Sequence, residues 1–190
     1  MIPSAIAAYA ATPARRRTLV VIALHFLIYA ALMVWMYRVR AAADEWPVPF
    51  EFGSLLMVFA MGMGALCGSI TQAVAASRVD KGESEEPIRW IAIAISSWLM
   101  VLILEAVEWV RMFYLVRLGP DTPFGMTYFA ITGAHLVGII VCVGWFTFCL
   151  TNVRQRDILA SALYSHFIAI WWIVIVFLIY FPNMDPLKNL

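Results

Sequence analysis

The amino-acid sequence predicts an all-α integral membrane protein built as one bundle of five transmembrane helices. Of its 190 residues, 64% are hydrophobic and 13% are charged, whereas soluble domains average about 45–50% apolar and about 25% charged residues. A bilayer span needs about 20 apolar residues in a helix, because every backbone polar group must be satisfied internally. Five stretches meet this requirement: residues 18–37, 54–76, 90–113, 127–150 and 160–180.

The first two stretches carry no formal charge. Stretch 18–37 is too long for a signal peptide and ends in MVWMYRVR, which lacks a small-residue cleavage pattern, so we expect a retained helix. In the second stretch Ala60, Gly64 and Gly68 recur at four-residue steps. Small residues at this spacing predict a close contact with a neighbouring helix.

The third stretch contains Glu105, Glu108 and Arg111. Spacings of three and six residues place these side chains within roughly a third of the helix circumference, so they form one polar stripe that faces one neighbour. Arg111 is close enough along the helix to neutralise Glu108. Ionisable side chains at membrane depth are costly unless paired, so each requires an explanation.

The predicted membrane depths divide the ionisable residues into two tiers. At about 1.5 Å of rise per residue, Glu105 and Glu108 in the third helix and His135 in the fourth lie about 8–12 Å below the outer helix ends. His25 in the first helix and His166 in the fifth lie about 9–10 Å from the inner face. The sequence therefore predicts an outer tier and an inner tier.

The connectors between the stretches are short, so we expect residues 1–190 to form a single membrane domain. Eight lysines and arginines lie at the N-terminus and in the second and fourth connectors, against five on the other side. The positive-inside rule then predicts a cytoplasmic N-terminus and a C-terminus on the opposite side. The eight are Arg15, Arg16, Arg17, Arg78, Lys81, Arg89, Arg154 and Arg156; the five are Arg38, Arg40, Arg111, Arg117 and Lys188.

Two interpretations of the outer tier remain open. In the first, His135 donates a hydrogen bond to a carboxylate across the helix interface, and the stripe holds helices together. In the second, the stripe is part of a proton or ion pathway. The first is favoured, because a pathway normally continues across the bilayer and no further ionisable residue occurs between the tiers.

Three membrane histidines also raise the possibility of a b-type haem, which needs two facing imidazoles at one depth. Only His25 and His166 share a depth, and they lie on the first and last helices, so haem is disfavoured. No HxxxH or ExxH spacing occurs, and Cys67, Cys142 and Cys149 form no CxxC motif, so no metal site is expected.

Other function classes are excluded by charge and motif content. The 13 basic residues barely exceed the 12 acidic ones, so no basic surplus exists to bind nucleic acid. The connectors contain no Ser/His/Asp set, glycine-rich phosphate loop or paired acids. We therefore expect no catalytic site in this chain.

Residues 105–144 contain Glu108-Trp109, then Gly125 to Phe129, then Thr132-Gly133 with His135. This order resembles haem-copper oxidase subunit III, the cytochrome c and quinol oxidase family, in its pattern Q-x-x-E-[YW], an outer loop, and G-x-x-[FY]-F-x-x-T-G-x-H. The last stretch, with His166, Phe167 and Trp172, is similar to that family's W-H-F-V-D-x-x-W helix. Five helices with the N-terminus inside is the layout of its short members.

Four departures suggest a divergent member. Glu105 stands where the family has glutamine, Gly138 where it has a second histidine, and Ala169 where it has aspartate. On a loose alignment His25 takes the place of the family's membrane-embedded glutamate. These differences keep open a related role, as a subunit III-like partner of a nitric oxide reductase or of another respiratory complex.

The resemblance implies an accessory subunit of a bacterial inner-membrane oxidase. Such a subunit packs on catalytic subunit I, holds lipids in its clefts, and supports assembly and proton uptake. Haem and copper would then belong to the partner subunits. A free-standing small transporter that uses the Glu105/Glu108 stripe is the alternative from a different functional class.

The resemblance also implies roles for the membrane polar residues. Glu105, Glu108 and His135 would lock the third and fourth helices together, with Arg111 as the counter-charge. His25 and His166 would make the inner polar contacts. Gly133, in the T-G-x-H pattern, is expected at a packing position.

Overall fold

The computed structural model describes residues 12–43, 46, 55–83, 85–151, 153 and 157–180. Within these residues all regular structure is helical, and five helices are long and apolar enough to cross a membrane. The prediction of an all-helical chain with five helices long and apolar enough to span a membrane is therefore confirmed. The elements are α2 (Pro13–Ala42), α3 (Leu55–Asp80), α4 (Glu86–Val110), the π-helix η2 (Arg111–Leu115), α5 (Pro123–Thr151), α6 (Ile158–Ile175) and the π-helix η3 (Val176–Tyr180).

Most helices extend beyond the predicted apolar stretches, because hydropathy marks only the part that suits hydrocarbon. Polar residues prolong and cap the ends. Thr12 caps α2 by accepting a hydrogen bond from the backbone N–H of Arg15, and Asp157 caps α6 by accepting one from Ala160. The predicted start of the second stretch at residue 54, and the cations Arg154, Arg156 and Lys188, lie outside the described residues.

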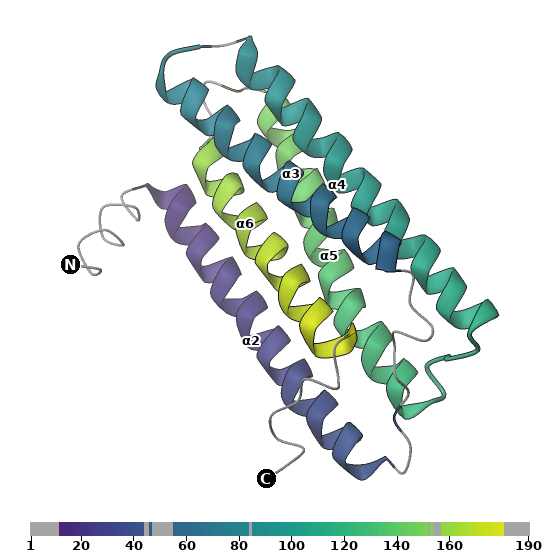
Figure 1. The fold of residues 1–190 in the computed structure, drawn as a ribbon. Coiled ribbons are helices and arrows are strands. Elements are labelled where there is room, and N and C mark those ends of the chain that lie inside the picture. The colour runs from purple at the N-terminus through teal and green to yellow at the C-terminus, as the bar shows by residue number, and fades with distance from the viewer. Residues whose placement is uncertain are drawn as a thin grey trace.

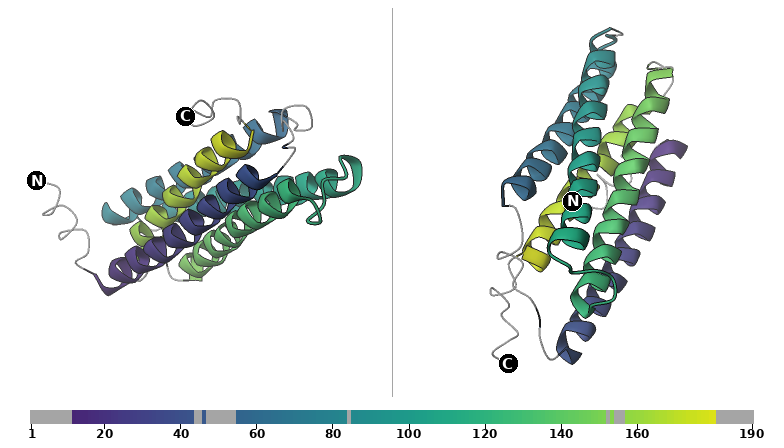
Figure 2. Two further views of the ribbon diagram at one scale, coloured as in Figure 1. Left: turned by 90° about the horizontal axis from the view of Figure 1, so that it is seen from below. Right: turned by 90° about the vertical axis from the view of Figure 1, so that its right-hand side faces the viewer.

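Successive helices run in alternating directions. Helices α2 and α6 therefore begin at the same end of the bundle and run the same way (Figure 1). Helix α6 packs against α3, α5 and α2, and α5 packs against α4, α2 and α6. The right-hand view in Figure 2 shows α3 and α4 on one side of α6, with α2 and α5 on the other. Side chains of α5 and α6 therefore reach most of the bundle.

Helices α3 and α4 make the most extensive helix–helix contact in the described residues. A Cβ atom added to Gly64 would lie 2.7 Å from Met100 Cε and Val101 Cγ2, and one added to Gly68 would lie 2.6 Å from the Trp98 ring. Both glycines are buried, and Ala60 is half-buried. These two glycines allow the backbone of α3 to approach the large side chains of α4.

Trp98 of α4 lies at this contact, against Gly68 of α3. It is fully buried, and its indole Nε1 donates a 3.1 Å hydrogen bond to Ser165 of α6. The indole therefore joins α4 to α6 while its ring fills the space above Gly68 of α3. Gly133 of α5 is packed less tightly, because an added Cβ would lie 3.5 Å from the Trp109 ring, an ordinary contact distance.

We expect Gly68→Ala to destabilise the bundle by about 1–3 kcal/mol, because the new methyl group overlaps an indole that cannot move without losing its hydrogen bond. Gly144→Ala in α5 is the matched control, since an added Cβ there meets nothing within 4 Å. Thermal unfolding in detergent should show a lower Tm for Gly68→Ala and an unchanged or slightly higher Tm for Gly144→Ala. Equal Tm values would contradict the packing argument.

Candidate functional site

The outer tier contains a buried acid–imidazole pair. Glu105 of α4 and His135 of α5 approach to 3.2 Å between Oε2 and Nδ1, and their side chains are only 2% and 0% exposed. The His135 ring packs on the Trp172 ring of α6, with centroids 5.2 Å apart. Side chains of three helices thus meet at this pair, which lies at the α4–α5 interface where the sequence placed a polar contact.

Each member of the pair has a second polar atom without a partner. Glu105 Oε1 and His135 Nε2 are buried and have no hydrogen-bond partner among the described residues. A carboxylate can accept several hydrogen bonds, and each imidazole nitrogen either donates or accepts one. The pair therefore retains unused hydrogen-bonding capacity in the interior of the bundle.

Glu108 makes a separate ion pair with Arg111. The guanidinium Nε and Nη2 donate to the two carboxylate oxygens at 2.7 and 2.6 Å. Glu108 is 1% exposed and Arg111 is 21% exposed, so the cation reaches toward the surface while the anion stays buried. The predicted single stripe thus divides: Glu105 pairs with a neighbouring helix, and Glu108 pairs with its own.

Uncharged polar contacts complete the outer tier. Trp109 Nε1 donates a 2.9 Å hydrogen bond to Thr132 Oγ1 of α5, which in turn donates to the backbone carbonyl of Tyr128. The hydroxyls of Tyr128 and Tyr180 lie 3.4 Å apart. Helices α4 and α5 are therefore joined by two side-chain contacts one turn apart, Glu105 to His135 and Trp109 to Thr132.

In the inner tier, each histidine contacts a hydroxyl group on another helix. His25 Nδ1 of α2 lies 2.7 Å from the Tyr164 hydroxyl of α6, and the His166 Nδ1 of α6 forms a short hydrogen bond with Ser69 Oγ of α3. His25 also stacks on Tyr29 with ring centroids 5.7 Å apart. The two imidazoles thus form hydrogen bonds with different helices.

Sequence reasoning missed the partners of these histidines and a further cluster at the inner end. Gln72 Nε2 of α3 donates a 2.7 Å hydrogen bond to Ser161 Oγ of α6, and Ser161 donates to the carbonyl of Ile158. The sequence did contain a signal for this cluster. Serines and a glutamine lie inside the apolar stretches, and such side chains must also find hydrogen-bond partners in a membrane.

The histidine geometry bears on haem and metal binding. The Nδ1 atoms of His25, His135 and His166 already contact Tyr164, Glu105 and Ser69, respectively. No group of three or more His, Cys, Asp or Glu side chains suited to a metal occurs in the part of the chain that the structure describes. Cys142 and Cys149 are buried, and Cys67 is exposed on α3.

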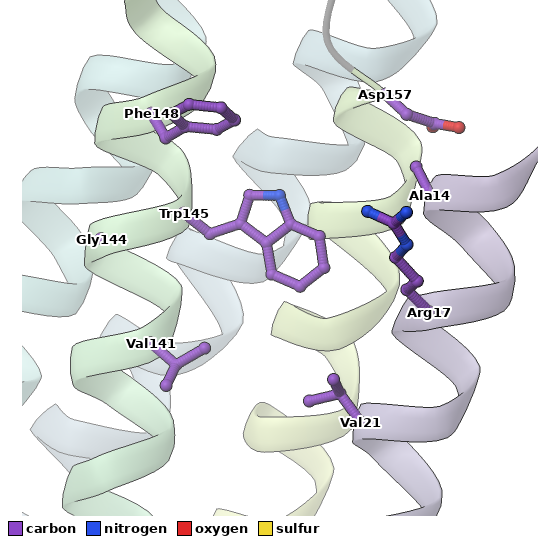
Figure 3. Close-up of a pocket in the computed structure, with 8 residues that line it drawn as sticks. All are labelled: Ala14, Arg17, Val21, Val141, Gly144, Trp145, Phe148 and Asp157. Carbon is purple, nitrogen blue, oxygen red and sulfur yellow. The ribbon is translucent and has the colours of Figure 1, made fainter.

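Asp157 joins the start of α2 to the start of α6. Its Oδ2 accepts a 2.7 Å hydrogen bond from Thr12 Oγ1 and a 2.9 Å one from Arg15 Nε. Beside this contact lies a cavity of about 690 Å³ between α2 and α5 (Figure 3). It is lined by Ala14, Arg17, Val21, Val141, Gly144, Trp145, Phe148 and Asp157.

The cavity has a polar end and an apolar end. Figure 3 shows the Trp145 indole projecting from α5 into the space toward α2, with Arg17 and Asp157 near one end and Val21 and Val141 toward the other. The polar end holds the Arg17 guanidinium and the Asp157 carboxylate, which is paired with Arg15, and the other end has aliphatic walls, so the cavity is amphipathic. The polar end lies beside the first turns of α2 and α6.

No protein-family model matches the chain. The chain is similar to the probable cytochrome c oxidase subunit 3 of Mycobacterium bovis and to that of Mycobacterium tuberculosis strain H37Rv. In each case the identity is 23% over 175 residues, which cover 86% of this chain and 85% of the relative. The similarity is low but extends over most of both chains, and it supports a distant relationship to that oxidase subunit.

We expect Arg111→Gln to destabilise the chain by about 2 kcal/mol or more. The substitution leaves the buried Glu108 carboxylate without a counter-charge, and the partial exposure of Arg111 reduces the effect. The double variant Glu108→Gln/Arg111→Gln should recover more than half of this loss, since it removes the uncompensated charge. Unfolding in mixed detergent micelles measures both.

Arg117→Gln, an exposed position outside the helices, is the control and should leave the free energy of unfolding unchanged. A double variant as unstable as Arg111→Gln alone would show that the ion pair is not what stabilises this end of α4.

Proposed function

We propose that this chain is a non-catalytic accessory subunit of a respiratory haem-copper oxidase, packed against the catalytic subunit. The observation that carries the proposal is the similarity to the subunit 3 sequences over 86% of the chain. The geometry supports it, because the family-like residues Trp109 and Thr132 are in contact, and the family-like His135 contacts Glu105, which stands at the family's glutamine position. These residues join α4 to α5 and need no substrate to account for them.

The outer surface supports a role within a complex. Of the most apolar 18 residues of α2, only 17% are buried, against 44% in α3 and α6. Leu24 and Leu27 of α2 are 57% and 62% exposed, and Ile103 of α4 is 62% exposed. Lipid or another membrane subunit must cover this surface, and an oxidase catalytic subunit is the partner that the relatives suggest.

The redox groups are proposed to belong to partner subunits. The contribution of this subunit would be support of assembly and of proton uptake by its partner. As a subunit of a nitric oxide reductase or of another respiratory complex, the chain would contact its partner through the same exposed helix surfaces.

The proposed setting is the bacterial inner membrane, with the N-terminus in the cytoplasm and the C-terminus in the periplasm. The first turns of α2 carry Arg15, Arg16 and Arg17, which fits the positive-inside rule. In this orientation the polar end of the α2–α5 cavity lies near the cytoplasmic surface. Arg17 is then placed to meet a lipid phosphate, with the acyl chain along Val21 and Val141.

The proposal is tested by purifying the tagged full chain from its membrane in mild detergent and identifying co-purified proteins by mass spectrometry. We expect a haem-copper catalytic subunit in near-stoichiometric amount. A reductase catalytic subunit in its place would assign the chain to that complex instead.

Recovery of the chain alone, or only with copies of itself, would contradict the accessory role. That result would favour the transporter alternative, which predicts ion flux into proteoliposomes that is lost in Glu108→Gln.

Lipid binding at the cavity has its own test. We expect Arg17→Gln to lose at least one bound anionic phospholipid in native mass spectrometry, because the substitution removes the cation from the polar end. Arg38→Gln, an exposed arginine at the other end of α2, should retain the wild-type lipid count. An unchanged lipid count in Arg17→Gln would remove the cavity from the proposal.

A further inference from the structure

Another cavity, of about 420 Å³, lies between α3 on one side and α6 with η3 on the other. We call it the α3–α6 groove. Its volume is within the range of about 300–1,000 Å³ that is typical of small-molecule sites. One wall is a face of α3 from Leu55 to Leu66, and the other is a face of α6 and η3 from Trp172 to Tyr180. Part of this second wall is a π-helix, a form that occurs frequently at functional sites.

The groove is apolar except for an unused hydrogen-bond donor. None of the lining residues that the structure describes is charged, and only Trp172 and Tyr180 among them carry an N–H or O–H group. The Tyr180 hydroxyl lies 3.4 Å from the hydroxyl of Tyr128. The Trp172 indole Nε1 has no hydrogen-bond partner in the described part of the chain, although Trp172 is only 2% exposed. An indole nitrogen can only donate, so a ligand there must supply an acceptor.

The Nε1 edge of the Trp172 indole lies beside Gly62 of α3. A Cβ atom added to Gly62 would lie 3.5 Å from Nε1 and 3.6 Å from Cδ1 of that indole. Both residues line the groove, so the missing side chain of Gly62 leaves room within the groove next to the N–H. The Trp172 ring also packs on the His135 ring of α5, with centroids 5.2 Å apart. The indole is therefore held between α5 and the groove.

The donor lies well inside the membrane span. Trp172 is about two helical turns before Tyr180, where η3 ends, and Gly62 is about two turns after the start of α3. At about 5.4 Å per turn, both lie about 11 Å below these helix ends. Bulk water cannot satisfy a donor at this depth. The ester carbonyls of a phospholipid lie in the interfacial region outside the hydrocarbon core, so they do not reach the donor either.

We propose that the α3–α6 groove binds the ring of a membrane quinone, with a quinone carbonyl accepting a hydrogen bond from Trp172 Nε1. A quinone carries carbonyl acceptors on an apolar ring, so it brings an acceptor to a depth where a phospholipid has only acyl carbons. Phe59 and Phe177 in the walls suit a flat ring, because aromatic rings favour offset-stacked and edge-to-face contacts. The proposal concerns binding alone and does not depend on the accessory function.

The test observes the Trp172 indole directly. The full chain is labelled with ¹⁵N at the indoles of its eight tryptophans, reconstituted in phosphatidylcholine nanodiscs, and titrated with decylubiquinone, and the resonance is assigned by its absence in Trp172→Phe. We expect a saturable downfield shift of the Trp172 indole proton, because a hydrogen bond to a carbonyl deshields it. Decylbenzene, a ring and chain without carbonyls, should leave this resonance in place. No shift with decylubiquinone, or an equal shift with decylbenzene, would overturn the proposal.

Gly62→Ala tests the space beside the donor. The new methyl group meets the indole at an ordinary contact distance, so the variant should keep the wild-type Tm. We expect its affinity for decylubiquinone, read from the same titration, to fall at least about threefold, because the methyl group occupies the approach to Nε1 and one hydrogen bond is lost.

Gly144→Ala is the matched control, since this glycine lies outside the groove and an added Cβ there meets nothing within 4 Å. It should bind decylubiquinone as the wild-type chain does. Unchanged affinity in Gly62→Ala would overturn the proposal, because a carbonyl bound to Trp172 Nε1 must pass the position of the new methyl group.

Discussion

The requirement that buried polar atoms be paired where no bulk water reaches them governs this structure. Apolar side chains give little preference between neighbours in a membrane, since lipid tails are as apolar as leucine. Helix choice then depends on the few polar contacts and on close packing. Glu105 with His135 and Trp109 with Thr132 join α4 to α5, while Trp98 with Ser165 joins α4 to α6. Each contact satisfies groups that lipid would leave unpaired.

Close packing acts together with these polar contacts. Gly68 leaves space for the Trp98 ring, and the same indole reaches across to Ser165 of α6. At the end of the bundle where α2 begins, Asp157 caps α6 and also accepts hydrogen bonds from Thr12 and Arg15. The first and last helices are thus joined near one surface, and α5 and α6 lie where they can contact most of the bundle.

The sequence was sufficient to predict the five helices and the pairing of Glu108 with Arg111, because both follow from local rules: apolar length for the first and a three-residue helical spacing for the second. It also pointed to the contact of His135 with a carboxylate of the third helix. The hydroxyl partners Tyr164 and Ser69 could not be predicted, because a tyrosine or serine in an apolar stretch carries no mark of which histidine it will meet.

What the sequence by itself determined is the set of spans, the composition of the polar tiers, and the resemblance that suggests an oxidase subunit, because all three depend on residue identity and spacing along the chain. Only the tertiary structure decided which helices pair and which polar atoms remain unpaired. That His25 of α2 meets the Tyr164 hydroxyl of α6 depends on the rotation of helices about their axes. This rotation is fixed by packing between segments distant in sequence, such as Trp171 on Tyr29, and not by any local pattern.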